Sequence, residues 1–310
     1  MIRVGFVLLS HTCPEQVLAL THVLTELYDA PPIVCHHDFD QAPLVKAAFP
    51  SNVRFVEPHF RTFWGCFSIV PAALAAINLL MRAANPPDWF YLLSGSDYPT
   101  INPEKALMLL ASTDSDVFID HREIHYRNEL GKQSDERSTG FSRPGYNALA
   151  YKRYCAVAVP RPSMAKPFSF PPVGRSYLRH PAWRSVFPAP FESGFRCFAG
   201  EHWFTANAKA AEVLLMETER SEQLFQHLRT RESPEECYYH TVLANAALRL
   251  ENDNLRYIKW PSPDAWHPKT LDVSDLRAIE ESGAHFARKV AYQSDLMHLL
   301  SRKFGVGQPA

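Results

Sequence analysis

The first 120 residues alternate apolar runs with amphipathic segments. Two of these segments, residues 14–28 and 68–83, carry apolar side chains at helical spacing, with a proline in the first turns. The apolar runs have the length of buried strands, and they lie at residues 2–9, 33–36, 53–56, 88–93 and 116–120. Strands that alternate with helices pair in parallel, with helices on both faces of the sheet. The pattern therefore predicts an α/β fold with a mostly parallel central sheet flanked by helices.

Residues 121–195 differ from this pattern. They are rich in Arg, Pro, Tyr and Ser and show little periodicity, apart from one expected strand at 151–158. A loop-rich insertion of this length is usually functional, and its aromatic content argues against simple disorder. We therefore expect an irregular insertion between two regular parts of the chain.

Regular patterns return from residue 196. The run Ser233-Pro234-Glu235-Glu236 is typical of a helix start, with Ser as the N-cap, Pro at the first helical position and Glu at the third. This capping box is expected to open a helix over 236–248. Further expected elements are a strand at 195–198, a segment at 203–207 continuing into a helix at 208–217, a helix around 219–229, a strand at 255–260, a helix opened by 274–276, and a mostly helical segment at 285–303.

Composition and charge limit the possible functions. Hydrophobic residues make up 46% of the 310 residues, enough for the core of one large domain. The net charge is -1, so the chain has no overall basic excess and nucleic acid is a poor candidate partner. Any anion that binds must be held by a local cluster of positive charge.

The sequence also bears on location. No stretch reaches about 18 uncharged apolar residues, and the first apolar run lacks the cleavage site of a signal peptide. The six cysteines are scattered without a CxxC pair, which favours free thiols over a disulfide framework. We therefore expect a cytoplasmic protein with at most peripheral contact with the inner face of the membrane.

Polar clusters follow three of the predicted strands. They are Ser10-His11-Thr12, His36-His37-Asp38 and Ser94-Gly95-Ser96-Asp97. In open α/β sheets the ligand binds beyond the carboxyl ends of the strands. These clusters are therefore expected to line the ligand site.

A divalent metal is one possible feature of such a site. Asp38-Phe39-Asp40 has the DxD pattern by which many nucleotide-sugar enzymes hold a metal, but it follows the second strand, which is early for that role. The turn that ends at Asp97 has one acid, and two hard oxygen ligands are the usual minimum for a catalytic Mg²⁺ or Mn²⁺. We expect no required metal, with a metal site at Asp38-Phe39-Asp40 as the alternative.

Three further features have a structural and a functional interpretation. Glu236, beside Glu235, is either a helix-capping side chain or a carboxylate for proton transfer. Trp260 is either a core residue or a platform for a sugar ring. The late basic residues form either a solvated face or a binding site for a diphosphate, and they are Lys269, Arg277, Arg288 and Lys289. Residue spacing alone favours the helix-capping role for Glu236 and the solvated face for the late basic residues.

Together these segments resemble the core-2/I-branching β-1,6-N-acetylglucosaminyltransferase family, glycosyltransferase family 14, which also contains the peptide O-xylosyltransferases. They occur in family order over nearly the whole chain. The similar segments are His36-His37-Asp38, Arg61 with Trp64-Gly65 and Ser68, Asp88 to Pro99 (DWFYLLSGSDYP), Gly200 to Phe204 (GEHWF), Ser233 to Glu236 (SPEE), His240 to Asn245 (HTVLAN), Leu255 to Trp260 (LRYIKW) and Phe286 to Lys289 (FARK).

The resemblance implies a GT-A-type fold and an inverting transfer from a UDP-sugar to a hydroxyl of a glycan or glycolipid. It implies that Glu236 is the catalytic base. It also implies that Lys289, with Arg288 and Lys269, holds the diphosphate without a metal, so that no cofactor is required. The nucleotide-sugar pocket is expected to include His11, His36, Asp38, Arg61, Ser94 and Asp97.

The acceptor side is expected to include Trp260 and Trp203. The sequence departs from xylosyltransferase-like members at His202, where those members have an Asp that is a candidate base. This departure makes His202, or Glu201 before it, a second-choice catalytic residue.

The resemblance also suggests how one catalytic domain is divided. Residues 1–120 are the expected nucleotide-binding half, 121–195 the acceptor-side insertion, and 196–310 the catalytic and diphosphate-binding half. GlcNAc is the expected sugar, with xylose or glucuronate as alternatives. A catalytically inactive sugar- or nucleotide-binding module is the alternative from another class.

Overall fold

The computed structural model describes residues 2–125, 146–161, 174–180, 182–183, 189–262, 265 and 267–306. Within them a seven-stranded sheet has the order β12-β6-β11-β4-β1-β2-β3. Its neighbouring strands are parallel, except that β11 runs antiparallel to both β4 and β6. The strands are β1 (Val4–Ser10), β2 (Ile33–His37), β3 (Val53–Phe55), β4 (Trp89–Ser94), β6 (Val117–Ile119), β11 (Phe204–Asn207) and β12 (Leu250–Glu251). The predicted α/β class and mostly parallel central sheet are confirmed.

Alternate side chains of the central strands enter two separate cores. On β1, Val7 packs into one core, while Phe6 and Leu8 pack into the other. All three are fully buried, because successive side chains of a strand point to opposite faces and both faces are covered. This double burial explains why β1 is continuously apolar in the sequence.

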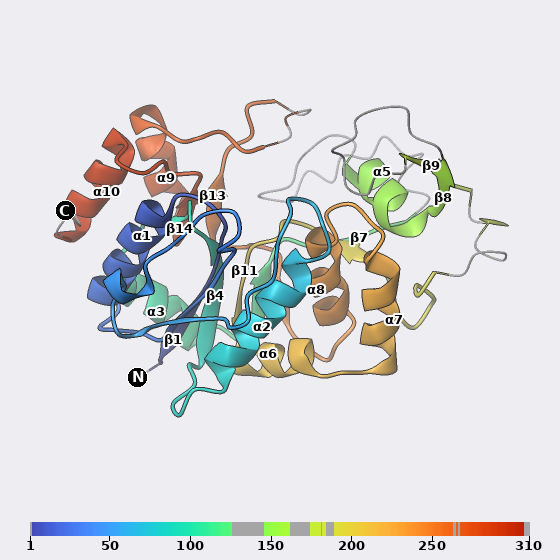
Figure 1. The fold of residues 1–310 in the computed structure, drawn as a ribbon, viewed down its shortest axis with the longest axis horizontal. Coiled ribbons are helices and arrows are strands. Elements are labelled where there is room, and N and C mark those ends of the chain that lie inside the picture. The colour runs from blue at the N-terminus through green and yellow to red at the C-terminus, as the bar shows by residue number, and fades with distance from the viewer. Residues whose placement is uncertain are drawn as a thin grey trace.

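Helices cover both faces of the sheet (Figure 1). One core contains side chains of α2 (Ile69–Met81), α6 (Ala208–Leu215), α7 (Glu219–Leu228) and α8 (Glu235–Ala244). The other contains side chains of α1 (Pro14–Leu27), α3 (Pro103–Ser112), α9 (Leu276–Ser282) and α10 (Asp295–Phe304). No helix among the described residues is long and apolar enough to cross a membrane.

Smaller elements complete the described chain. A three-stranded sheet has the order β13-β14-β5, and β7 pairs with β10 and β8 with β9, both antiparallel. The bounds are β5 (Tyr98–Pro99), β7 (Arg122–Glu123), β8 (Val157–Arg161), β9 (Gly174–Leu178), β10 (Phe198–Ala199), β13 (Arg256–Ile258), β14 (Phe286–Arg288), α5 (Tyr146–Ala150), the π-helix η2 (Tyr151–Cys155), and the 3₁₀ helices η1 (Lys46–Ala48) and η4 (Val273–Asp275).

Arg256 ties the small sheet to the central one. Its buried guanidinium donates hydrogen bonds to the carbonyl oxygens of Leu92 (2.9 Å) and Phe204 (3.0 Å) and to Oγ1 of Thr205 (2.7 Å). Burial lowers the pKa of Arg256 to about 10, so the side chain stays charged at neutral pH. These hydrogen bonds hold β13 near the carboxyl end of β4, and β14 pairs with β13.

Four expected elements differ from the structure. The strand expected at 151–158 is the π-helix η2 followed by β8, and the strand expected at 195–198 is reduced to β10. The segment at 203–207 forms β11, a strand inside the central sheet. Residues 285–303 begin with β14 and become helical only at α10. The strands β8, β10, β11 and β14 have few residues and are fixed by their pairing partners, which a local pattern does not contain.

The helix start at Ser233 also differs from the expected capping box. Ser233 has a φ of 47°, and the helix has Pro234 as its N-cap without a side-chain cap. The backbone N–H of Ser233 donates to the carbonyl oxygen of Gly65 (2.9 Å), and Tyr154 donates its hydroxyl to the carbonyl oxygen of Ser233 (2.7 Å). These tertiary contacts replace the capping box and leave the Glu236 side chain for another role. The helix ends at Ala244 rather than at 248.

The division of the domain into two halves and an insertion stays a prediction. Much of the expected insertion at 121–195 lies outside the described residues.

Candidate active site

A cavity of about 410 Å³ lies where the carboxyl ends of β1, β2 and β4 meet the start of α8 and the end of β14. This is the place at which open α/β sheets bind ligands, and the volume is within the range of small-molecule sites. Ten residues expected in the site line this cavity. They are His11, His36, Ser94, Glu201, His202, Trp203, Glu236, Trp260, Arg288 and Lys289.

Four expected site residues do not line the cavity, namely Asp38, Arg61, Asp97 and Lys269. Arg61 is exposed and lies over the ring of Phe63, with 5.3 Å between the guanidinium carbon and the ring centroid. Lys269 pairs with Asp272 (2.8 Å) and Asp275 (2.7 Å), and these two contacts raise its pKa. The charge of Lys269 is therefore already paired with two carboxylates that lie a few residues later in the chain.

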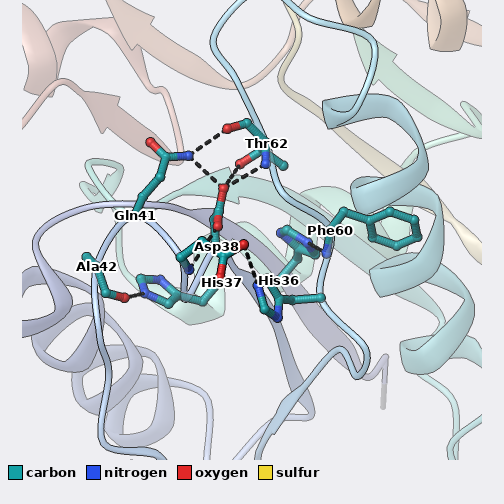
Figure 2. A network of polar contacts seen from close by, with 9 residues as sticks. His36, His37, Asp38, Gln41, Ala42, Phe60 and Thr62 are labelled. Carbon is teal, nitrogen blue, oxygen red and sulfur yellow. Dashed lines mark hydrogen bonds and ion pairs between the residues drawn. The ribbon is translucent and has the colours of Figure 1, made fainter.

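Asp38 is buried and forms hydrogen bonds with Gln41 and Thr62, two residues that line the cavity (Figure 2). Its Oδ2 accepts hydrogen bonds from the backbone N–H of Thr62 (2.7 Å), the Thr62 hydroxyl (3.0 Å) and Nε2 of Gln41 (2.6 Å). Burial alone would raise the pKa of Asp38, but these hydrogen bonds outweigh it and lower the pKa to about 2. Asp38 therefore anchors the segment that leads to Trp64 on the cavity wall.

The neighbouring histidines are anchors of the same kind (Figure 2). Nε2 of His36 accepts a hydrogen bond from the backbone N–H of Phe60 (2.9 Å), and burial lowers the pKa of His36 to about 4. His37 lies between the Ser10 hydroxyl (2.8 Å) and the carbonyl oxygen of Ala42 (2.7 Å). Both imidazoles hold loops in place as neutral rings.

One group of described residues has spacing suited to a metal ion. Ligand atoms of Asp38, Asp40 and His59 lie within 4.8 Å of one another. None of the three lines the cavity, and Oδ2 of Asp38 already accepts three hydrogen bonds. The group therefore does not fit a metal that acts on a ligand in the cavity.

Asp97 shapes the turn after β4. Its Oδ2 accepts a hydrogen bond from the backbone N–H of Ser94 (2.7 Å), and the side chain is buried. The carbonyl oxygen of Ser96 in this turn accepts from the backbone N–H of Val290, just after β14 (2.9 Å). The turn thus joins the end of β4 to the segment that carries the cavity's cations.

Arg288 and Lys289 bring positive charge to the cavity. The guanidinium carbon of Arg288 lies 4.3 Å from the centre of the Trp203 ring, and Arg288 is buried. Burial lowers the pKa of Lys289, and the charge of Arg288 lowers it further. Neither side chain has a carboxylate within 4.0 Å among the described residues. Two such cations favour an anionic ligand.

Trp203 and His202 belong to a stack of flat groups. The His202 ring lies between Trp203, with centroids 4.4 Å apart, and Tyr239, at 5.5 Å and nearly parallel. Burial, and then the charge of Arg288, lower the pKa of His202 well below its usual value. His202 is therefore a neutral side chain, and Trp203 serves as the platform for Arg288. The neighbouring Glu201 is held through its carbonyl oxygen, which accepts from Nε2 of His240 (2.9 Å).

Two carboxyl groups at the start of α8 line the cavity. Oε2 of Glu236 accepts a hydrogen bond from Nη1 of Arg153 (3.1 Å), and the Glu236 side chain is 27% exposed. Glu235 is 6% exposed, and burial, with the charge of Glu236, raises its pKa to about 8. One acid is thus in an ion pair at the cavity wall, and its neighbour is protonated at neutral pH.

Several site residues were not predicted from the sequence. Arg153 comes from η2, in the expected insertion, and no local signal marks it. Glu235 was visible as an acid beside Glu236, but its burial was not. Trp64 and His267 line the cavity with their rings 5.2 Å apart, and Trp64 is 61% exposed. With Trp260 they give the cavity wall three aromatic rings that can contact a sugar.

Comparisons with known proteins show relatives of this chain. Two curated relatives from Arabidopsis thaliana are named beta-glucuronosyltransferase GlcAT14B and GlcAT14A, at 26% identity over 273 residues and 24% over 269. Each alignment covers 83% of this chain, and the chain spans about half the length of these relatives, 54% and 53%.

Two solved glycosyltransferases are distant neighbours. The bifunctional WbbM has a TM-score of 0.42 at 9% identity, covering 99% of this chain and 50% of that one. The galactosyltransferase LgtC has a TM-score of 0.40 at 10% identity, covering 97% and 95%. Both likenesses are too weak to carry an inference about function. The family model of the Core-2/I-Branching enzymes matches residues 36–281, and this chain belongs to that family.

Proposed function

We propose that this protein is an inverting glycosyltransferase that moves a sugar from a UDP-sugar to a hydroxyl of a glycan or glycolipid. The family membership and the names of the curated relatives support sugar transfer. The observation that carries the proposal is the presence of Glu236, Arg288 and Lys289 on the wall of one cavity. Transfer from a nucleotide-sugar needs a base for the acceptor and positive charge for the leaving diphosphate, and the cavity offers both.

The proposed mechanism is a single in-line displacement. Glu236 accepts the proton of the acceptor hydroxyl as its oxygen attacks the anomeric carbon of the donor. The bond from that carbon to the diphosphate breaks, and UDP leaves with the bonding electrons. Arg288 and Lys289 stabilise the charge that develops on the diphosphate, without a required metal. Arg153 orients the Glu236 carboxylate through its hydrogen bond.

His202 is a weaker candidate base. Its pKa lies well below the usual value, so the ring takes up a proton poorly at neutral pH. Lys269 contributes less to diphosphate binding than its neighbours, because two carboxylates already pair with it. The proposed catalytic set is therefore Glu236, Arg288 and Lys289.

We propose UDP-GlcNAc as the donor. UDP-glucuronate is the second candidate, because both curated relatives are named beta-glucuronosyltransferases. UDP-xylose is the third. A binding module without activity would bind one of these donors and release no UDP in the presence of any acceptor.

A thermal-shift screen tests the proposal. The protein is melted with UDP, UDP-GlcNAc, UDP-glucuronate and UDP-xylose, each with and without EDTA. A ligand of the native state raises the melting temperature, and a concentration 100-fold above Kd adds about 2.7 kcal/mol. We expect UDP and at least one UDP-sugar to raise the melting temperature, and EDTA should not change this rise. The rise should be smaller in the Arg288→Met variant. The proposal fails if no uridine nucleotide shifts the wild-type melting temperature.

A further inference from the structure

Several residues that line the cavity carry a buried polar atom without a hydrogen-bond partner among the described residues. Two of these atoms are Oε2 of Glu235 and Nε2 of His202. Glu235 is 6% exposed and His202 is 9% exposed, and both residues line the cavity. Buried polar atoms in folded proteins are nearly always paired with protein or with ordered molecules. Two such atoms on one cavity wall therefore point to a ligand that supplies their hydrogen bonds.

Both side chains are buried, which limits their movement, and the His202 ring is also held by stacking. The His202 ring is stacked between Trp203 and Tyr239. Glu235 is the first residue of α8, and its neighbour Glu236 is held by Arg153. A hydrogen-bonding group that is fixed before the ligand arrives loses little conformational entropy on binding. The arrangement therefore suits selective recognition.

Both side chains are also uncharged near neutral pH. Burial raises the pKa of Glu235 to about 8, so its carboxyl group keeps a proton. Burial lowers the pKa of His202, so its ring is neutral. A protonated carboxyl group and a neutral imidazole can each donate and accept a hydrogen bond. A sugar hydroxyl has the same two capacities.

The surroundings indicate which part of the ligand these groups meet. His202 stacks on Trp203, the platform of the cation Arg288. Glu235 directly precedes Glu236, the proposed base. In an in-line displacement the transferred sugar lies between the leaving diphosphate and the attacking oxygen. His202 therefore lies beside the cation end of the cavity, and Glu235 lies beside the proposed base.

We infer that Glu235 and His202 form a subsite that binds hydroxyl groups of the transferred sugar ring. This inference rests on the proposed function and adds the residues that recognise the donor's sugar. The matching ligand is a pyranose with free hydroxyls. A site built around such hydrogen bonds rejects an analogue that lacks the hydroxyl, because the buried groups are then left unpaired.

Isothermal titration with UDP and with UDP-sugars separates sugar recognition from nucleotide binding. Each probe, UDP alone, UDP-GlcNAc, UDP-glucuronate and UDP-xylose, is titrated into the wild-type protein, and the tightest UDP-sugar is carried forward. The variants are Glu235→Met, which fills the same space without polar atoms, Glu235→Gln, which keeps hydrogen bonding, and His202→Phe, which keeps the stack. Glu212→Ala on the exposed face of α6 is the matched control.

We expect Glu235→Met and His202→Phe to weaken UDP-sugar binding about tenfold and to leave the Kd of UDP within about twofold. Glu235→Gln is expected to stay within about threefold of the wild type for both probes. A Kd of UDP close to the wild-type value shows in each case that the variant is folded. The subsite is refuted if Glu235→Met and His202→Phe change both Kd values equally, or change neither. A wild-type protein that binds neither UDP nor any UDP-sugar would overturn the proposed function as well, so the two failures are distinct.

Discussion

The pH dependence of stability should change when Glu235 is replaced by Gln. The carboxyl group of Glu235 has a pKa near 4.5 when unfolded and about 8 when folded. Between these values the folded state holds a proton that the unfolded state has released. The contribution of this group to stability is therefore fully present below about pH 4.5 and is lost as the pH rises through 8.

The size of the effect follows from the same two values. Each unit of pKa difference is worth about 1.36 kcal/mol, so the free energy of unfolding should fall by about 5 kcal/mol over the whole titration of this group, from well below pH 4.5 to well above pH 8. Gln has a similar shape and does not titrate. The advantage of Glu235→Gln over the wild type should therefore grow with pH.

Urea unfolding of the wild type and of Glu235→Gln at pH 5, 7 and 9 measures this directly. Subtraction of the two curves cancels the other titrating groups, and exposed Glu212→Gln is the control. We expect the difference to rise by several kcal/mol from pH 5 to pH 9, and to rise less in a Glu236→Gln background, because the charge of Glu236 contributes to the shift. Parallel curves for the two proteins would show that Glu235 titrates normally and would refute the reasoning.

Three further predictions concern the scaffold and the cations. Gly200→Ala should lower the free energy of unfolding in urea by about 3 kcal/mol or more, because the added Cβ would lie 1.8 Å from a backbone carbonyl oxygen, and an unchanged midpoint would contradict this contact. Asp38→Asn should weaken the hydrogen bonds with Thr62 and lower the free energy of unfolding at pH 7 by about 2 kcal/mol. The loss should be smaller near pH 2, because the wild-type Asp38 itself becomes protonated there. Equal losses at both pH values would argue against the pKa of about 2. Arg288→Lys keeps the positive charge but loses the contact of the planar guanidinium with the Trp203 ring. We expect UDP to bind about tenfold more weakly, as measured by calorimetry. Binding with wild-type affinity would show that the charge alone is sufficient.

The longest strands and helices could be predicted from the sequence because their patterns are local. β1 and β4 carry no charged residue and are hydrophobic up to their final serines, since alternate side chains enter two cores. α1 and α2 repeat their apolar positions over several turns. The local pattern predicts β14 as part of a helix, because a strand of three residues is too short to show a hydrophobic period. Its strand conformation depends instead on pairing with β13 and β5.

The candidate site was predictable where it follows strand ends. His11 directly follows β1, and His36 and Ser94 lie at the carboxyl ends of β2 and β4. These three strand ends meet at the cavity. Arg153 could not be found in this way, because it approaches Glu236 from a π-helix 83 residues earlier in the chain. The sequence also could not show that Asp38 accepts its hydrogen bonds inside the wall, facing Thr62.

The central claim is that Glu236 removes the proton of the acceptor hydroxyl. The most direct measurement is acceptor-dependent release of UDP from the UDP-sugar that binds, compared between the wild type and Glu236→Gln in excess EDTA. The wild type should turn over at full rate without metal, and Glu236→Gln should lose at least about 100-fold in kcat, the usual contribution of a general base. The Kd of UDP should stay within about twofold, because Gln keeps the size of the side chain. Near-normal turnover by Glu236→Gln would show that another group takes the proton.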